Sequence, residues 1–301
     1  MIHPHRFSRR RFVASSIAFA TTLELQRAAW ALGFSSAAEV CKLVPEQEVG
    51  PFYVADELLR RNITEGKAGV PLAIRLMVLD SRSCKPLTNA AIDLWHCDAM
   101  GLYSGYTSGN PMGGPGGFGG PPRDRDGSGR PPGPPPDGFG PPPGGAPKPT
   151  DKLTFLRGIQ ITDNEGAARF DTVFPGFYMG RTNHVHFKVR VGGNEGESSS
   201  HHTYLAGHTA HTGQLFFPEE LAVELMKHEP YSTHKIHRTT QGEDMVYNGQ
   251  HGSEVISKVV FAREGHAEAG LTANLIVAVD PTATPEPVGV GGRGGFRPRR
   301  S

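Results

Sequence analysis

The sequence has 301 residues, and its 31 Lys and Arg against 30 Asp and Glu give a formal net charge of +1. This balance offers no electrostatic basis for binding nucleic acid, so we expect no nucleic-acid partner. Hydrophobic residues make up only 37% of the chain, which also holds 39 Gly and 26 Pro. Because the Gly and Pro gather in a few segments, the remaining residues suit a single globular domain.

The first 31 residues have the layout of a signal peptide. "SRRRFV" resembles the twin-arginine class, an apolar stretch follows at 13–23, and a small-x-small cleavage site lies at 29–31. We therefore expect export to the periplasm or the extracellular space. A basic leader without that role is the alternative, because Glu24 and Arg27 interrupt the apolar region. No later segment approaches the roughly 18 apolar residues that a membrane helix needs, so we expect no transmembrane segment in the mature protein.

Two further segments are predicted to be disordered. Residues 109–149 contain 14 Gly and 14 Pro in 41 positions, and residues 281–301 form a Pro- and Gly-rich, mildly basic tail. Neither can bury enough apolar surface to offset the entropy of ordering the chain. The folded unit is therefore expected over 32–280, with 109–149 as an insertion within it.

The rest of the chain favours strands. Short apolar or alternating segments, separated by turn residues, predict strands at 71–80, 91–97, 155–162, 167–174, 184–190, 254–262 and 274–280. One helix is expected over 218–228, with Pro218 in its first position and Lys-His at its end. This pattern predicts an all-β fold, an antiparallel β-sandwich with one short helix and one long Gly/Pro-rich loop.

The three cysteines are Cys41, Cys84 and Cys97. In an exported protein two of them could form a disulfide and leave one thiol free. The sequence leaves the pairing open, although Cys41 could tie the N-terminal end to the body of the domain. None has the spacing of a cysteine-based zinc site.

The alternating segment "HVHFKV" places two imidazoles on one side of a predicted strand. His184 and His186 share a face, while Val185, Phe187 and Val189 point to the other face and are expected in the core. Taken alone, a His-x-His pair is more often part of a solvated polar face than a metal site. The neighbouring residues decide between the two interpretations.

Tyrosines accompany the histidines. Tyr178 follows the turn-forming "FPG", and only five residues separate it from His184, so it can fold back over the start of that strand. Phenolate oxygen is a hard anionic donor that favours ferric iron, and imidazole binds iron well. Such a site needs a second tyrosine. Tyr103, just after the strand at 91–97, is the candidate, and Tyr106 is its local alternative.

Three blocks of the sequence carry a resemblance to a known family. "DLWHCDAMGLYSGY", "FLRGIQITDNEGAARFDTVFPGFYMGRTNHVHFKV" and "HTGQLFFPEEL" resemble successive parts of the intradiol ring-cleavage dioxygenases, from about Cys41 to about Phe217. The resemblance implies a β-sandwich enzyme with non-haem Fe(III) that opens a catechol between its two hydroxyl-bearing carbons. Its substrates would be a catechol and O₂, and its product a cis,cis-muconate-type diacid. The likeness is closer to exported, single-domain members, and an oligomer is compatible with the sequence.

The resemblance also implies roles for individual residues. Carried over by position, the metal ligands are Tyr103, Tyr178, His184 and His186. In the family the second tyrosine leaves the metal when substrate binds, so Tyr178 would also be catalytic. The interval from Tyr178 to His184 is shorter than in the better-known catechol enzymes.

Two further catalytic residues and a substrate-binding segment are implied. Arg181, three residues before the first histidine, would stabilise negative charge on the reacting ring; its structural alternative is a surface ion pair. Gln214 matches a family glutamine, although residues 191–211 lengthen its distance from the histidines. "GPFY" resembles a segment that lines the substrate pocket, which makes Pro51 and Tyr53 candidate substrate contacts.

Two other functions remain as alternatives. One is a non-catalytic β-sandwich that binds a ligand or partner, and the other is a Zn or Fe(II) enzyme that combines His-x-His with a carboxylate. Four more histidines lie within 201–211, namely His201, His202, His208 and His211. We expect these to be solvated loop histidines and not a second metal site.

Overall fold

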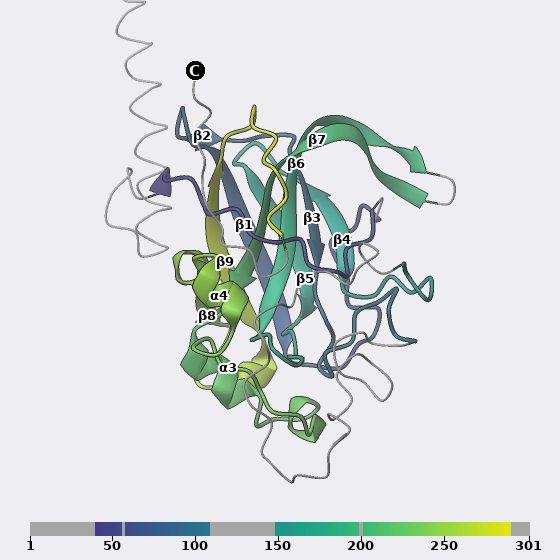
Figure 1. Ribbon diagram of the computed structural model, residues 1–301, viewed down its shortest axis with the longest axis vertical. Helices are drawn as coiled ribbons and strands as arrows, with labels where there is room; N and C mark the ends of the chain where they lie inside the picture. The colour runs from purple at the N-terminus through teal and green to yellow at the C-terminus, as the bar shows by residue number, and fades with distance from the viewer. Residues whose placement is uncertain (1–39, 56–57, 109–147, 199–200, 290–301) are drawn as a thin grey trace, which may run out of the picture.

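The computed structural model describes residues 40–55, 58–108, 148–198 and 201–289, which form two β-sheets packed as a sandwich (Figure 1). The expected signal peptide, almost all of the 109–149 insertion and the end of the C-terminal tail lie outside these residues. Within them, no helix is long and apolar enough to span a membrane. The predicted all-β sandwich is confirmed.

The first sheet has the strand order β2-β1-β9-β8, with β5 also paired to β1. Its strands are β1 (Pro71–Asp80), β2 (Lys85–Pro86), β5 (Ala167–Val173), β8 (Lys258–Phe261) and β9 (Leu271–Val279). One pair departs from the antiparallel expectation, because β1 and β9 run parallel from Leu72↔Leu271 to Asp80↔Val279. A parallel pair needs a long connection, and here the chain forms the whole second sheet and several helical segments between β1 and β9.

The second sheet carries the predicted histidine strand. Its order is β4-β3-β6-β7, all antiparallel, with β4 at Arg157–Ile161, β3 at Ala91–Trp95, β6 at His184–Ser198 and β7 at His201–Phe216. Strands β6 and β7 form a long hairpin that extends past the sheet as an arm (Figure 1). The expectation of a loop over 201–211 is therefore wrong. Gly and His give little strand signal, but pairing with β6 satisfies the backbone of this segment.

The core between the sheets contains the apolar residues that the alternating pattern of 184–190 predicted there. Val185, Phe187 and Val189 are fully buried and pack in one cluster with Ile74 and Leu76 of the opposite sheet. The imidazoles of β6 consequently lie on the other face of the second sheet, away from this core.

The helical segments gather at one end of the sandwich (Figure 1). They are α3 (Glu219–Leu225), α4 (Met245–Gly249) and three short 3₁₀ turns at Tyr231–Thr233, Gly252–Val255 and Ala267–Ala269. Helix α3 is shorter than expected: Pro218 is its N-cap, and the chain after Leu225 tightens into turns in which N–H groups bond the carbonyl three residues back. Helix α4 was not predicted.

A disulfide joins Cys41 to Cys84, which lies between β1 and β2, and Cys97 is a buried free thiol. The N-terminal end of the described chain is thus tied to the first sheet, as the position of Cys41 suggested.

Candidate metal centre

The outer face of the second sheet brings three side chains into one row. Trp95 pairs with His186 across β3 and β6, and His186 pairs with Gln214 across β6 and β7. Residues opposite each other on neighbouring strands point to the same face. The Trp95 ring stacks on the His186 ring with centroids 5.1 Å apart and planes 5° apart. Strand β6 runs out to Ser198 and strand β7 runs back from His201, so Gln214 pairs with His186 despite the long interval in sequence.

Two loops bring tyrosines to this row. Tyr103 lies in the loop after β3, and Tyr178 lies in the loop before β6. Glycines let the two loop backbones touch. A Cβ on Gly101, which has φ +78°, would collide with the carbonyl oxygen of Phe177, and one on Gly176 would lie 2.5 Å from a carbonyl oxygen of the first loop.

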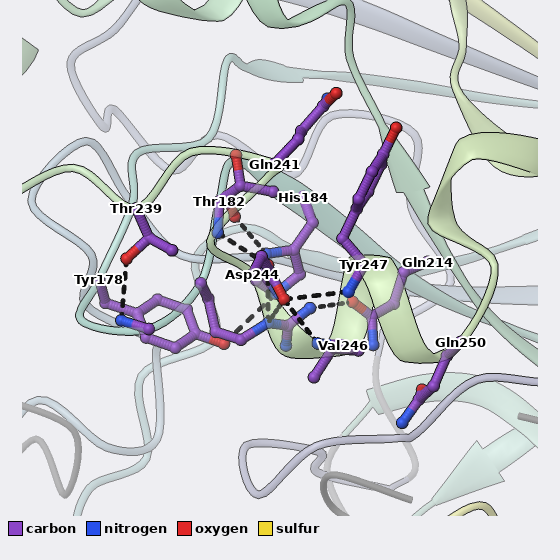
Figure 2. A network of polar contacts seen from close by, with 12 residues as sticks. Tyr178, Thr182, His184, Gln214, Thr239, Gln241, Asp244, Val246, Tyr247 and Gln250 are labelled. Atoms are coloured by element: carbon purple, nitrogen blue, oxygen red, sulfur yellow. Dashed lines mark hydrogen bonds and ion pairs between the residues drawn. The ribbon is translucent and has the colours of Figure 1, made fainter. Parts of the chain in front are cut away.

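A tight turn fixes the spacing between Tyr178 and Arg181. The backbone N–H of Arg181 donates to the carbonyl of Tyr178 at 3.1 Å, and Gly180 supplies the positive φ of +80°. The Gly180 N–H donates to the hydroxyl of Thr239 at 3.0 Å (Figure 2). The turn is therefore held at both its ends and its tip.

Four side-chain donor atoms converge where the loops meet the strand. The His184 Nε2 atom lies 3.1 Å from His186 Nε2, 3.3 Å from the Tyr178 hydroxyl oxygen and 3.4 Å from the Tyr103 hydroxyl oxygen. All four side chains are buried. Ligands about 2.1 Å from one ion, at angles of about 90–110°, lie roughly 3.0–3.4 Å from one another. The three distances measured from His184 Nε2 fall in this range.

The protonation of the histidines suits metal binding. The Nδ1 atom of His184 donates to the carbonyl of Thr182 at 2.6 Å, which leaves its Nε2 lone pair facing the other donors. Burial, together with neighbouring positive charge, lowers the pKa of both His184 and His186, so both are neutral at pH 7. Neutral imidazole is the form that binds a metal.

The two phenols are kept protonated until a cation is near. Burial raises the pKa of the Tyr103 and Tyr178 hydroxyl groups, and Arg181 only partly opposes this effect. A bound cation would reverse that balance, because it favours the phenolate strongly. Across the described ranges, no group of three or more His, Cys, Asp and Glu could hold a metal ion. The atoms that meet at His184 Nε2 come from a second imidazole and two phenols.

Arg181 is paired inside the protein and not at its surface. Its Nε donates to Asp244 Oδ1 at 3.2 Å and Oδ2 at 3.1 Å, and one terminal nitrogen donates to the Gln214 side-chain oxygen (Figure 2). The other terminal nitrogen lies 3.9 Å from a carboxylate oxygen of Glu48. Burial opposes its charge, but the carboxylates of Asp244 and Glu48 raise the pKa of Arg181, so it stays a cation.

Solved structures resemble this fold. The intradiol ring-cleavage dioxygenase from Tetranychus urticae is 26% identical, with a TM-score of 0.62, over 82% of this chain and 98% of its own. In structure, the chain resembles the intradiol ring-cleavage dioxygenases. Another dioxygenase structure gives the same identity and TM-score over 81% and 97% of the two chains. The hydroxyquinol 1,2-dioxygenase from Pseudomonas putida DLL-E4 is 17% identical, with a TM-score of 0.45, over 87% and 74%. No protein-family model matches the chain, and no curated protein matches its sequence.

The group of four donors is covered by one aromatic residue that the sequence did not single out. Phe52 stacks on Tyr103 with ring centroids 4.5 Å apart and meets Tyr178 edge-on at 6.0 Å. It belongs to the "GPFY" segment, in which only Pro51 and Tyr53 had been named. An apolar side chain carries no chemical signal of its own, so only the fold reveals its place beside both phenols.

Two of the predicted tyrosines lie away from the four donors. The Tyr53 hydroxyl donates to Asp93 at 2.8 Å and its ring packs on Trp95, so the structure does not bring it into the group. Pro51 is half-buried, and its contact with substrate stays a prediction. The Tyr106 hydroxyl donates to the carbonyl of Tyr53 at 3.3 Å. Of the two tyrosines after β3, Tyr103 is the one whose hydroxyl oxygen lies 3.4 Å from His184 Nε2.

The histidines of 201–211 do not build a second site in the described part of the chain. His202 is exposed and lies 3.0 Å from Glu195 and 3.1 Å from Glu197, which raises its pKa. His211 is buried and bonds Glu46, so the expectation that it is solvated is wrong. Its strand packs against the N-terminal segment, which covers the imidazole.

Proposed function

We propose that this protein is a non-haem Fe(III) dioxygenase that cleaves a catechol-type ring between its two hydroxyl-bearing carbons. The reaction would insert both atoms of O₂ and yield a cis,cis-muconate-type diacid, a step in the breakdown of aromatic compounds. The observation that carries this proposal is the convergence of two phenol oxygens and two imidazole nitrogens in one buried place. The fold supports it, because the similar structures are intradiol dioxygenases.

Tyr103, Tyr178, His184 and His186 would hold the ion. Two phenolates are hard anionic donors that suit ferric iron and neutralise most of its charge, while the neutral imidazoles complete the set. When bound, a ferric ion supplies a Lewis acid for the catechol oxygens and an acceptor for ring electron density.

The side chains around the donors have complementary roles. Tyr178 would accept a hydroxyl proton from the incoming catechol, since a phenolate released from a cation is a strong base in this buried setting. Arg181 would stabilise negative charge that develops on the substrate oxygens. Gln214 holds one edge of that guanidinium, and Phe52 covers the phenols with an apolar surface that excludes water.

We also propose that the protein acts outside the cytoplasm. The twin-arginine-like leader supports this, and so does the Cys41–Cys84 disulfide, because disulfides persist in oxidising compartments. Export through a pathway for folded proteins would allow iron to be loaded before translocation.

Oxygen uptake over a panel of substituted catechols, with the products identified by mass spectrometry, tests the reaction. With ¹⁸O₂, the ring-opened diacid should carry two labelled oxygen atoms, one in each new carboxyl group. Iron-loaded protein that consumes no O₂ with any catechol would contradict the proposal. So would a product opened beside, and not between, the hydroxyl-bearing carbons.

A further inference from the structure

Asp244 is a fully buried carboxylate that no sequence motif marks, 63 positions from Arg181 along the chain. One of its oxygens, Oδ1, accepts the backbone N–H groups of Val246 and Tyr247 at 2.8 and 3.0 Å, which caps helix α4 (Figure 2). Both oxygens face the Nε of Arg181, and Oδ2 also accepts the N–H of Thr182 at 2.9 Å. The group thus joins α4 to the loop that leads into the histidine strand.

A helix cap alone does not account for these contacts. Capping requires only one side-chain oxygen that accepts an N–H at the start of the helix, and Oδ1 already does this. Burying a full negative charge for that purpose is costly, because Ser, Asn or Thr caps as well without a charge. The second oxygen, Oδ2, accepts hydrogen bonds from Arg181 and Thr182, and the negative charge pairs with the Arg181 guanidinium. Both residues lie beside the proposed metal ligands, so Asp244 can influence that site.

The contact with Arg181 fixes the plane of its guanidinium. Asp244 binds the Nε edge, the Gln214 side chain accepts from one terminal nitrogen, and Glu48 faces the other at 3.9 Å. Partners on three sides leave the guanidinium one orientation. A cation that stabilises charge during a reaction works best when it needs no reorientation at that moment.

The contact with Thr182 reaches a candidate ligand. Asp244 holds the Thr182 N–H, and the Thr182 carbonyl accepts the Nδ1–H of His184 at 2.6 Å. The hydrogen bond at the second ring nitrogen sets the tautomer and direction of a metal-binding imidazole. The Asp244 carboxylate therefore holds Arg181 directly and His184 through the backbone of Thr182.

We propose that Asp244 is a positioning residue of the ring-cleaving site, which holds Arg181 directly and His184 through the backbone of Thr182. This inference rests on the proposed function of that site.

Asp244→Asn is the test variant, because asparagine keeps the oxygen that caps α4. Its amide nitrogen would replace Oδ2 and face the Nε of Arg181 and the N–H of Thr182, which are both donors. The contacts of Oδ2 and the negative charge are therefore lost, although Oδ1 still lies 3.2 Å from the Arg181 Nε. We expect iron to be lost to a chelator at a concentration about 10-fold to 100-fold lower than for the unaltered protein. We also expect kcat for catechol to fall by about 10-fold or more, with a smaller change in KM.

Glu219→Gln is the matched control. Glu219 also pairs with a guanidinium that contacts this loop, that of Arg238, which bonds Asn183 at 3.0 Å and the Thr182 hydroxyl at 3.4 Å. It contacts neither Arg181 nor the backbone N–H of Thr182. We expect Glu219→Gln to lower stability without changing iron retention or kcat. This is the pattern that a residue with a purely structural role would give.

A double variant isolates the part that acts through Arg181. Once Arg181→Gln has removed the guanidinium, adding Asp244→Asn should change kcat by less than about 3-fold, although iron retention should still fall through His184. Asp244→Ser, which caps the helix but is too short to reach Arg181, is made in parallel, and the same criteria apply to whichever variant folds.

The outcomes separate this inference from the function on which it rests. Folded Asp244 variants with unaltered iron retention and kcat, beside an active parent, overturn the role of Asp244 alone. A parent protein that neither binds iron nor cleaves catechols overturns the proposed function and this inference together. Loss of iron retention and kcat in the Asp244 variants, but not in Glu219→Gln, supports it.

Discussion

Asp93 is a buried carboxyl group on the same face of the sheet as His186, one row further along β3. Burial raises its pKa to about 6 from 3.8, although the Tyr53 hydroxyl and nearby Lys188 oppose the shift. Because this pKa is higher in the folded than in the unfolded chain, the folded protein binds the proton more tightly. Its stabilising contribution is complete below about pH 4 and is lost as the pH rises through 6.

The corresponding prediction concerns the pH dependence of stability. Between pH 4 and 7 the unaltered protein should lose up to about 3 kcal/mol of unfolding free energy relative to Asp93→Asn, whose side chain does not titrate. Urea unfolding at several pH values measures both proteins. Parallel curves would show that Asp93 titrates as an ordinary surface carboxyl.

Tyr178, a proposed ligand, and Tyr106 are expected to respond differently to the loss of the hydroxyl group. Tyr178→Phe should remove one phenolate, change the visible absorbance of the iron-loaded protein and slow turnover by about 100-fold or more. Tyr106→Phe, which loses the hydrogen bond to the backbone carbonyl of Tyr53, should leave both nearly unaltered. Equal spectra and rates for Tyr178→Phe and the parent would remove Tyr178 from the site.

At the scale of elements, the contact between two loops decides where the phenols lie. Gly101→Ala should lower the unfolding free energy by about 2–4 kcal/mol. Alanine at this position must adopt a positive φ, and its Cβ would collide with the carbonyl oxygen of Phe177. It should also weaken iron binding, because the two loops can no longer approach. Thermal unfolding and iron titration provide the measurements.

Gly66→Ala serves as the control for backbone strain. Gly66 has nearly the same φ, +74°, but a Cβ there meets nothing within 4 Å. It should cost about 1 kcal/mol and leave iron binding intact. Similar losses of iron in both variants would mean that strain, and not the approach of the loops, governs the site.

Local patterns predicted the part of the site that is local in sequence. Tyr178, Arg181, His184 and His186 span nine positions, so one turn and one strand place them. Phe52 and Asp244 were missed because their roles depend on packing between distant segments, and neither belongs to a pattern that carries chemistry. Strand β7 was missed because its Gly and His residues give a loop signal that pairing with β6 overrides.

At the scale of the whole molecule, the disulfide ties the N-terminal segment to the first sheet. It closes a loop of 43 residues, which in the chain-entropy account corresponds to about 4 kcal/mol. The double variant Cys41→Ser and Cys84→Ser should therefore unfold at a lower urea concentration and lose about 2–4 kcal/mol. A reducing agent should lower the stability of the parent but not of the variant. Equal stability of parent and variant would contradict the prediction.

The overall architecture was predictable except where distant strands meet. Alternation along 184–190 identified the core residues Val185, Phe187 and Val189, and the sandwich follows from many short strands. The parallel pairing of β1 with β9 was not predictable, because strand sequences carry little information about which distant partner they choose.

The visible absorption spectrum of the purified, iron-loaded protein tests the central claim most directly. Two phenolates on ferric iron should make the protein red-brown, and anaerobic addition of catechol should shift the band as the substrate replaces Tyr178. A colourless protein that binds zinc, or one that takes up no metal at all, would contradict the proposed centre at Tyr103, Tyr178, His184 and His186.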